Sequence, residues 1–260
     1  LMVRETILAS GGDFTNSQTT PFTLGNSTTP PPVVGEYYKA AQGKTGFELK
    51  TALFNIIKNH TRRGYSAIWI LIKEADLDNY YEQDGSILDM YSEKPTSDDT
   101  INFTKVTDQC GQYKTEGDCY NREHSFPKSW FGGKVEPMNS DAHHLFATDG
   151  YVNAKRSNWP FGEVGSSAYV SSNGSKLGLA ATTLDYVGTV FEPIDEFKGD
   201  FARAYFYMAT RYEDVIGHWE NNSSGSDAVL NGTSTTVFEP WMLNMLKRWH
   251  KNDPVSAKEI

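Results

Sequence analysis

Two neighbouring polar stretches, residues 121–132 and 140–158, constrain this chain more than any other part of it. They hold three of its six histidines: His124, His143 and His144. A strand or helix of a hydrophobic core repeats apolar residues with a period of about 2 or about 3.6 and keeps its charges outside. Here polar side chains interrupt every short apolar run. We therefore interpret the two stretches as a functional site and the rest of the chain as the scaffold that positions it.

The charge of the chain argues against a large nucleic-acid interface but leaves room for a local one. Its 24 Lys and Arg residues and 33 Asp and Glu residues give a net charge of −9. Residues 121–158 contain five basic and four acidic residues, so this segment is +1 and the remainder is −10. An acidic shell around a near-neutral centre suits a metal site that needs carboxylates. Its affinity for polyanions would depend on salt and on the metal.

No apolar run approaches the roughly 20 residues that a membrane-spanning helix needs, so we predict a soluble protein. The two cysteines, Cys110 and Cys119, lie in a Gly-rich loop just before the site. They either form a small-loop disulfide in an exported protein or remain two free thiols. The many Ser, Thr, Asn and Gly residues of the loops favour export with one disulfide. Residues 1–5 lead into no cleavable apolar region, as expected of a mature or trimmed chain.

Composition divides the chain into a linker and one domain. Residues 1–35 are rich in Thr, Pro, Gly and Ser, which is typical of an extended linker or of the remnant of an upstream region. For residues 36–260 we expect a single α+β domain, mainly helical, with its strands around the site. The predicted elements are helices at 45–62, 200–215 and 240–250, a helix or a strand at 67–76, a strand at 86–91, and loops at 162–178 and 221–235.

His124 is the residue best suited to activate a water molecule, because the ordinary pKa of histidine, about 6.5, leaves a neutral imidazole at neutral pH. Glu123 beside it offers a carboxylate. Asn153, in a short helix expected after Gly150, offers an amide oxygen. Oxygen ligands from one or two side chains, completed by water, are typical of Mg²⁺. Each residue alone would more often have an ordinary structural role, and their grouping is what favours a site.

Other polar residues of the two stretches have supporting or ambiguous roles. Arg156 either clamps a phosphate or ties the end of its helix to the strands. The pair His143 and His144 suggests zinc, but adjacent residues of a strand point to opposite faces. We therefore expect one of them near the site and the other in the core or in solvent, and assign His144 to support. Asp141 is expected to orient a neighbouring ring or backbone group.

A series of short motifs runs through the site and beyond it. They are Asn121-Arg122-Glu123-His124, Pro127-x-Ser129-Trp130-Phe131-Gly132, Pro137-Met138, Ser140-Asp141-x-His143-His144-Leu145, Asp149-Gly150-x-Val152-Asn153-x-x-Arg156-Ser157-Asn158, Glu196-Phe197-Lys198-Gly199-Asp200-x-Ala202-Arg203-Ala204 and Tyr207-Met208. In this order they resemble the bacterial endonuclease I family, over roughly residues 36–260. Its members are extracellular or periplasmic nucleases of the ββα-metal, or His-Me finger, type.

The resemblance implies a role for the main residues of the site. His124 would be the general base, and Glu123 and Asn153 would hold one Mg²⁺, with Mn²⁺ or Ca²⁺ as substitutes. The ββα-metal core would consist of a strand over 121–126, a loop to about 140, a strand near 143–148 and a helix from 150.

The chain departs from the family in the cation that steadies the cleaved phosphate. Members with a long loop between the two strands use an arginine from that loop. Here the loop is short and contains Lys134 but no arginine. The candidates are therefore Lys134, Arg122 and Arg156. The family also has a further C-terminal segment, expected after Ile260.

We therefore expect a secreted or periplasmic bacterial endonuclease, a monomer without a membrane span, that hydrolyses DNA and RNA with little sequence preference. His124 would take a proton from the attacking water. Mg²⁺ would offset the charge that develops on the phosphate, and the products would carry 5′-phosphate and 3′-hydroxyl ends. Two alternatives stay open: a zinc hydrolase that uses His124, His143 and His144, and a non-catalytic surface-binding module.

Overall fold

The structure, a computed structural model, describes residues 37–259, and the linker expected at 1–35 lies outside this range. Helices and strands are grouped along the described chain rather than alternating, and the strands of both sheets pair antiparallel, which makes the fold α+β. In chain order they are α3 (Gly46–Ile57), α4 (Ile68–Ala75), β1 (Tyr120–His124), β2 (Leu145–Asp149), α5 (Gly150–Arg156), β3 (Val164–Val170), β4 (Lys176–Ala180), β5 (Thr189–Glu192), α6 (Lys198–Arg211), α7 (Ser224–Asp227) and α8 (Pro240–Asn252).

Helix α6 forms the centre of the hydrophobic core. Every residue of this helix after Lys198 is buried. Its aromatic side chains contact others from distant segments: Phe161 lies 4.6 Å from Phe201 between ring centroids, and Phe126 lies 5.2 Å from Tyr205. The helix predicted at 200–215 is confirmed, but it ends at Arg211. Helices α3 and α8 and the turn before β2 cover α6 on several sides, which explains its burial all round.

Apolar residues one helical turn apart explain the other long helices. Helix α3 buries residues four positions apart: Leu49, Leu53 and Ile57. In α4, Ile68 and Ile72 are buried whereas Ile70 is half exposed, so the segment predicted as a helix or a strand is a helix. Helix α8 begins with Pro240, at a position where the missing N–H costs no hydrogen bond.

The strands form two separate antiparallel sheets. Strand β1 pairs with β2, with Tyr120 opposite Asp149 and His124 opposite Leu145. The second sheet has the order β3-β4-β5. Its middle strand contains Gly178, where an added Cβ would lie 2.1 Å from the backbone oxygen of Ser166. Close backbone approach therefore requires this glycine.

Two sequence predictions about strands were wrong. Loops were predicted at 162–178, yet strands β3 and β4 run through this region, because Gly165 and Gly178 permit close strand pairing and only Gly174, at positive φ, lies in the connection between the strands. The strand predicted at 86–91 is absent from the described structure, and only a single bridge joins Leu77 to Ile87. The segment predicted as a loop at 221–235 contains the short helix α7, which Ser223 caps.

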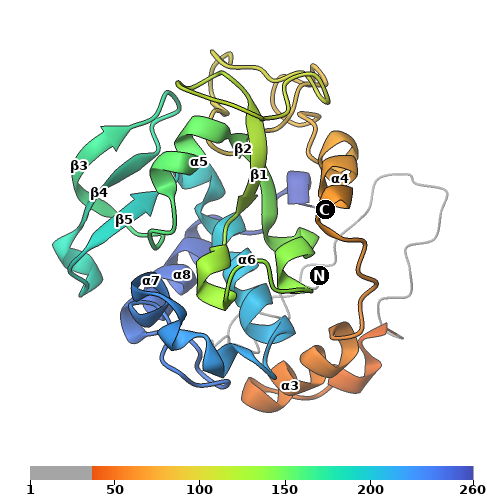
Figure 1. Cartoon of the computed structure of the whole chain (residues 1–260). Helices are drawn as coiled ribbons and strands as arrows, with labels where there is room; N and C mark the ends of the chain where they lie inside the picture. Colours follow the sequence, from red (N-terminus) through yellow and green to blue (C-terminus); the bar gives the residue numbers. More distant parts are fainter. Residues whose placement is uncertain (1–36, 260) are drawn as a thin grey trace.

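Strands β1 and β2 and helix α5 form a continuous unit in the middle of the molecule, with the three-stranded sheet on one side and α4 on the other (Figure 1). Asp149 ends β2 and starts α5, because its Oδ1 accepts hydrogen bonds from the backbone N–H groups of Tyr151 and Val152. This strand–loop–strand–helix order agrees with the prediction for residues 121–156.

Cys110 and Cys119 form a disulfide that braces this unit. The backbone N–H of Cys110 donates to the carbonyl of Tyr120, and the N–H of Gly150 donates to the carbonyl of Cys119. An added Cβ at Gly150 would lie 2.5 Å from Cys110 Sγ, so the disulfide packs directly on the start of α5. None of the helices in residues 37–259 is long and apolar enough to cross a membrane.

Candidate active site

Helix α5 lies against strand β1, and their facing side chains build the site. Asn121 and Glu123 are two residues apart on the strand and therefore share a face. Asn153 and Arg156 are three residues apart on the helix and also share a face. Asn153 Nδ2 donates to Asn121 Oδ1 at 2.7 Å, and Arg156 Nη1 donates to Glu123 Oε1 at 2.6 Å. The two contacts fix the position of α5 on β1.

A cavity of about 520 Å³ opens beside this unit. Glu123, His124 and Asn153 all line it. Tyr65 and Trp69, from the start of α4 and the turn before it, also line the cavity. The structure thus brings together the predicted base and both predicted metal ligands, although about thirty residues of sequence separate Asn153 from the other two.

His124 ends strand β1 and is held in one orientation. Its Nε2 lies 3.0 Å from the backbone carbonyl oxygen of Asn139. A carbonyl only accepts, so Nε2 carries the proton and Nδ1 keeps a free lone pair. Tyr65 stacks on the ring, with centroids 5.5 Å apart. Burial, and then the neighbouring His144, lower the pKa of His124 to about 2, so the imidazole is neutral at neutral pH.

Glu123 is a buried carboxylate with one oxygen already engaged. Its Oε1 accepts hydrogen bonds from Arg156 and from the hydroxyl of Tyr91, at 2.6 and 3.1 Å. Burial raises the pKa of Glu123, and the Arg156 guanidinium opposes this shift and favours the charged form. No described residue donates a hydrogen bond to Oε2, which belongs to a side chain on the cavity wall.

The amide of Asn153 is oriented in the same way. Because Nδ2 donates to Asn121, the oxygen Oδ1 points away from that contact, and no described residue donates to it. A carboxylate oxygen and an amide oxygen of two residues that line one cavity therefore have no hydrogen-bond donor in the described chain. Oxygen donors of this kind suit a hard cation such as Mg²⁺.

Arg156 is completely buried, with an exposed fraction of 0%. Besides Glu123, its guanidinium donates to the backbone carbonyls of His124 and Ser125, at 2.9 and 2.6 Å. It also lies 4.4 Å from the ring centroid of Phe161. This placement favours the second of the two roles that the sequence left open, the attachment of α5 to the strands, because a buried guanidinium with these partners does not face the cavity.

The other two predicted phosphate cations lie in different surroundings. Arg122 lines the cavity, but its guanidinium is stacked between Tyr65 and Trp69, at 3.7 and 4.2 Å, and donates to the Tyr65 carbonyl. Lys134 is exposed and is not among the residues that line the cavity.

Lys128 is a cavity residue that the sequence interpretation missed. Within residues 37–259 its ammonium group has no hydrogen bond or ion pair. Burial, followed by the charge of Lys134, lowers its pKa. Its position in the sequence could have indicated a place near the site, since Lys128 stands four residues after His124 and directly after Pro127. Lys128 lies in the same loop between β1 and β2 as Lys134, the lysine that was predicted.

The predicted supporting residues hold the turn before β2. Asp141 Oδ2 accepts from the hydroxyls of Tyr207 and Tyr212, at 2.8 and 2.7 Å, and so attaches this turn to α6. His144 is buried, contacts the His124 ring at 5.4 Å and lies 2.8 Å from the Met138 carbonyl. His144 and His124 therefore contact adjacent carbonyls of one turn, those of Met138 and Asn139.

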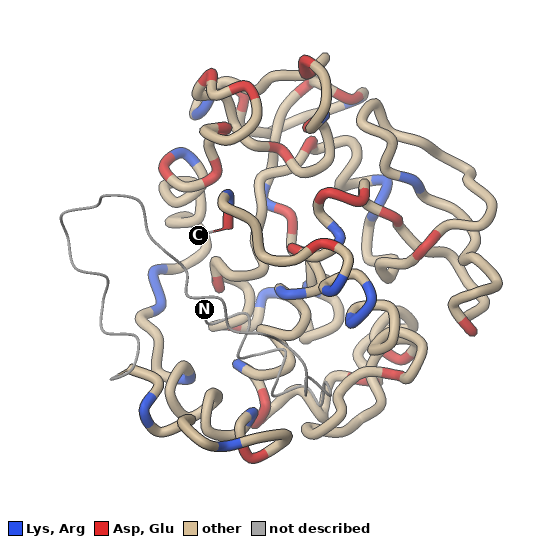
Figure 2. Tube along the Cα trace, turned by 180° about the vertical axis from the view of Figure 1, so that it is seen from behind, with Lys and Arg blue, Asp and Glu red and all other residues tan. Residues whose placement is uncertain are grey.

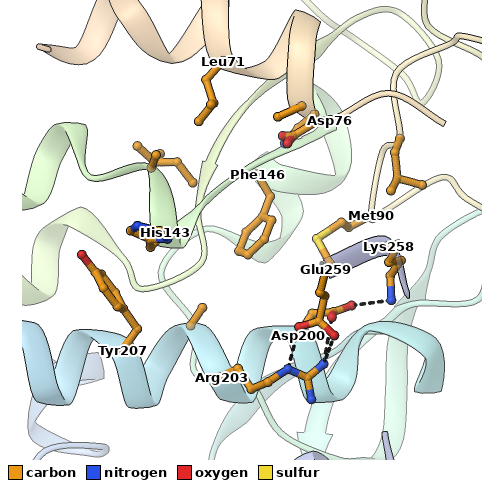
Figure 3. Close-up of a pocket in the computed structure, with 16 residues that line it drawn as sticks. Leu71, Asp76, Met90, His143, Phe146, Asp200, Arg203, Tyr207, Lys258 and Glu259 are labelled. Carbon is orange, nitrogen blue, oxygen red and sulfur yellow. Dashed lines mark hydrogen bonds and ion pairs between the residues drawn. The ribbon is translucent and has the colours of Figure 1, made fainter. Parts of the chain in front are cut away.

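The histidine pair lies in a short turn, η5 (Ala142–His144), and not in a strand as we assumed. His143 is exposed and lines a second cavity, of about 360 Å³, between α4, β2 and α6 (Figure 3). Charged residues of α6 and the C-terminal turn border that cavity: Asp200, Arg203, Lys258 and Glu259. The described structure therefore does not bring His124, His143 and His144 together around one point. The alternative of a zinc hydrolase would require these three histidines as ligands, and the described structure does not support it.

Comparisons with known proteins match most of the chain. The profile of the family described as Endonuclease I matches residues 45–260. The chain is 35% identical over 245 residues to a protein named extracellular ribonuclease from Bacillus amyloliquefaciens, an alignment that covers 92% of this chain and 73% of that protein. A protein of the same name from Bacillus subtilis (strain 168) is 34% identical over 227 residues, which cover 86% and 68% of the two chains.

A shorter match has a different name. Endonuclease-1 from Buchnera aphidicola subsp. Acyrthosiphon pisum (strain APS) is 29% identical over 87 residues, or 34% of this chain and 32% of that protein.

Proposed function

Since this chain belongs to the endonuclease I family and is therefore a nuclease, we propose that it is a secreted, Mg²⁺-dependent endonuclease that cuts DNA and RNA with little sequence preference. One observation carries the proposal: a neutral imidazole with a free Nδ1 shares a cavity with a carboxylate oxygen and an amide oxygen that lack partners in the described chain. A base beside a hard-cation donor set is the minimum machinery for phosphodiester hydrolysis.

We assign β1, β2 and α5 to a ββα-metal core of the His-Me finger type. The antiparallel strand pair followed directly by a helix supports this assignment. On this interpretation residues 36–260 form one catalytic domain and residues 1–35 form a linker.

The donor set fits Mg²⁺, which takes few protein ligands and keeps several waters. Glu123 and Asn153 would hold the ion through the two oxygens that face the cavity. Arg156 and Tyr91 contribute by fixing the Glu123 carboxylate, and Asn121 fixes the Asn153 amide. When bound, the ion would supply charge that offsets the negative charge developing on the phosphate.

His124 acts as the general base in this proposal. The Asn139 carbonyl holds the ring proton on Nε2, so Nδ1 takes a proton from a water molecule. The resulting hydroxide attacks phosphorus, and the bond from phosphorus to the 3′ oxygen breaks. A proton from solvent completes the 3′-hydroxyl, and the new fragment keeps a 5′-phosphate. No step of this reaction uses the ribose 2′-hydroxyl, which is why both DNA and RNA are proposed as substrates.

Lys128 is our choice for the cation that binds the phosphate. It lines the cavity, has no hydrogen bond or ion pair among the described residues and lies 6.0 Å from the ring centroid of Tyr65, whereas Arg122 is stacked more closely between two aromatic rings and Arg156 is buried. Contacts through phosphates carry no direct sequence information, which supports the low sequence preference. The disulfide and the extracellular relatives support secretion.

Analysis of product ends tests the proposed reaction. A supercoiled plasmid and a single-stranded RNA are digested in EDTA and again after Mg²⁺ is restored. We expect no cleavage in EDTA and, with Mg²⁺, 5′-phosphate and 3′-hydroxyl ends on both substrates. Cleavage of RNA alone, in EDTA, with 2′,3′-cyclic phosphate ends would contradict the proposal, because that chemistry uses the ribose and needs no metal.

A further inference from the structure

The segment between α4 and β1 is strongly acidic and is outside the proposed catalytic machinery. Residues 76–99 contain eight acidic residues and one basic residue, Lys94. In Figure 2 acidic positions recur along the loops at the top of the molecule. Three of these acids, Asp78, Glu82 and Glu93, bring one carboxylate oxygen each to within 4.8 Å of one another. Among the described residues they are the one such group of His, Cys, Asp or Glu side chains.

Backbone contacts hold the three carboxylates together. The bridge between Leu77 and Ile87 closes a loop, and Asp78 is pinned inside it because its two oxygens accept four hydrogen bonds from backbone N–H groups. The donors are Tyr80, Tyr81, Glu82 and Gln83, at 2.8 to 3.1 Å. The loop thus carries Glu82 close to Asp78. Glu93 arrives from the next turn, where its backbone N–H donates to the Asp89 carbonyl.

Glu93 is the feature that points to a ligand. Its exposed fraction is 1%, and neither of its carboxylate oxygens has a hydrogen-bond partner. The one nearby lysine in the sequence, Lys94, donates to Thr100 instead. Burial, followed by the charges of Asp99 and Glu82, raises the pKa of Glu93 to about 9. A buried carboxylate without a partner is costly, and either a proton or a cation can relieve that cost.

We propose that Asp78, Glu82 and Glu93 form a Ca²⁺ site, distinct from the proposed catalytic Mg²⁺ site. Ca²⁺ takes about six to eight oxygen ligands at about 2.3–2.6 Å, so ligands on opposite sides of it lie roughly 4.6–5.2 Å apart. The three oxygens fit within such a shell, and water completes it. Mg²⁺ holds its waters more tightly and is bound through about one or two carboxylates, which makes it the poorer fit to three.

The site has a structural consequence for the catalytic centre. Tyr91 lies two residues before Glu93, and its hydroxyl donates to Glu123 at 3.1 Å. A cation that fixes Glu93 therefore also fixes the turn that carries Tyr91. The site stabilises the fold and takes no part in the reaction, so it can be tested without an activity assay.

Thermal unfolding of the full chain tests the site. The Asn153→Ala variant serves as the background, because it removes one ligand of the proposed catalytic metal. We expect Ca²⁺ to raise the Tm of this variant by several degrees over EDTA, since a ligand that binds only the folded state stabilises it. Adding Glu93→Gln should abolish the Ca²⁺-dependent rise. Adding Asp98→Asn, a change of an exposed acid in the same segment, should leave it intact.

Other outcomes decide against the site. If Ca²⁺ leaves the Tm of the background unchanged, Glu93 is held by a proton and the proposal is overturned. An equal rise with Glu93→Gln, or an equal rise with Mg²⁺, overturns it as well. Should Glu93→Gln fail to fold, Glu82→Gln, which changes a solvent-accessible side chain, decides in its place: loss of the rise supports the site and an unchanged rise refutes it.

Discussion

At the scale of the residue, burial separates the roles of two cations near the site, Lys128 and Arg156. Lys128 lies in the first of the two polar stretches and Arg156 in the second, and both carry the same charge. Arg156 is enclosed by Phe161 and Tyr205, which come from later parts of the chain, and donates to Glu123. Lys128 lines the cavity and has no hydrogen bond or ion pair in the described structure. Their different roles therefore follow from tertiary packing and not from residue type.

Replacement of Lys128 should reduce catalysis but not stability. A hydrogen bond to a charged group contributes about 1.5–3 kcal/mol, so Lys128→Ala should lower kcat/KM by roughly 10- to 100-fold. Lys134→Ala is the matched control, because Lys134 is exposed and outside the cavity. Steady-state cleavage of an oligonucleotide measures both. Equal losses in the two variants would mean that Lys128 acts only through long-range charge.

Replacement of Arg156 should instead destabilise the fold. Arg156→Ala leaves the buried Glu123 carboxylate without its cation, and loss of one partner of a buried ion pair costs about 3–5 kcal/mol. Urea unfolding followed by circular dichroism measures this free energy. A variant as stable as the parent would show that Glu123 does not depend on Arg156.

At the scale of the element, sequence patterns predicted the helices and strands whose formation depends mainly on their own residues. The helices near 45–62, 200–215 and 240–250 have regular apolar spacing, and the unit of β1, β2 and α5 carries specific motifs, whereas the pattern at 67–76 left helix and strand open. The sheet of β3, β4 and β5 was missed because its glycines serve close strand pairing, which depends on residues far away in sequence. The turn containing His143 and His144 was missed because its conformation depends on Asp141. This residue accepts a hydrogen bond from the backbone N–H of His143 and is itself held by Tyr207 and Tyr212, which are distant in sequence.

Asp89, which lies close to Asp149 at the junction of β2 and α5, should make the stability of the fold depend on pH. Burial, and then the charge of Asp149, raise the pKa of Asp89 to about 8, whereas an aspartate of an unfolded chain ionises near pH 4. Between about pH 4 and about pH 8 the folded state keeps the proton that the unfolded state has released. Stability from this group therefore falls as pH rises through that window. Thermal unfolding in EDTA should show a weaker fall for Asp89→Asn, and an unchanged slope would contradict this assignment.

At the scale of the whole molecule, charge is divided between two regions with different tasks. Residues 76–99 concentrate acidic side chains, three of which form the proposed Ca²⁺ site. Residues 121–158 carry a net charge of +1 and contain the proposed base, metal ligands and phosphate-binding lysine. The buried contact from Tyr91 to Glu123 joins the two regions. On this proposal a protein with an overall charge of −9 would bind a polyanion locally, through a few cations and a metal.

The central claim is that His124 is the base of a metal-dependent nuclease, and plasmid nicking by two histidine variants tests it most directly. His124→Ala should lose about 10²- to 10⁴-fold of the Mg²⁺-dependent rate, the usual contribution of a general base. His143→Ala should retain the parent rate, because that side chain is exposed and lines the other cavity. Circular dichroism should show both variants folded. A folded His124→Ala protein that nicks the plasmid as fast as His143→Ala would contradict the assignment.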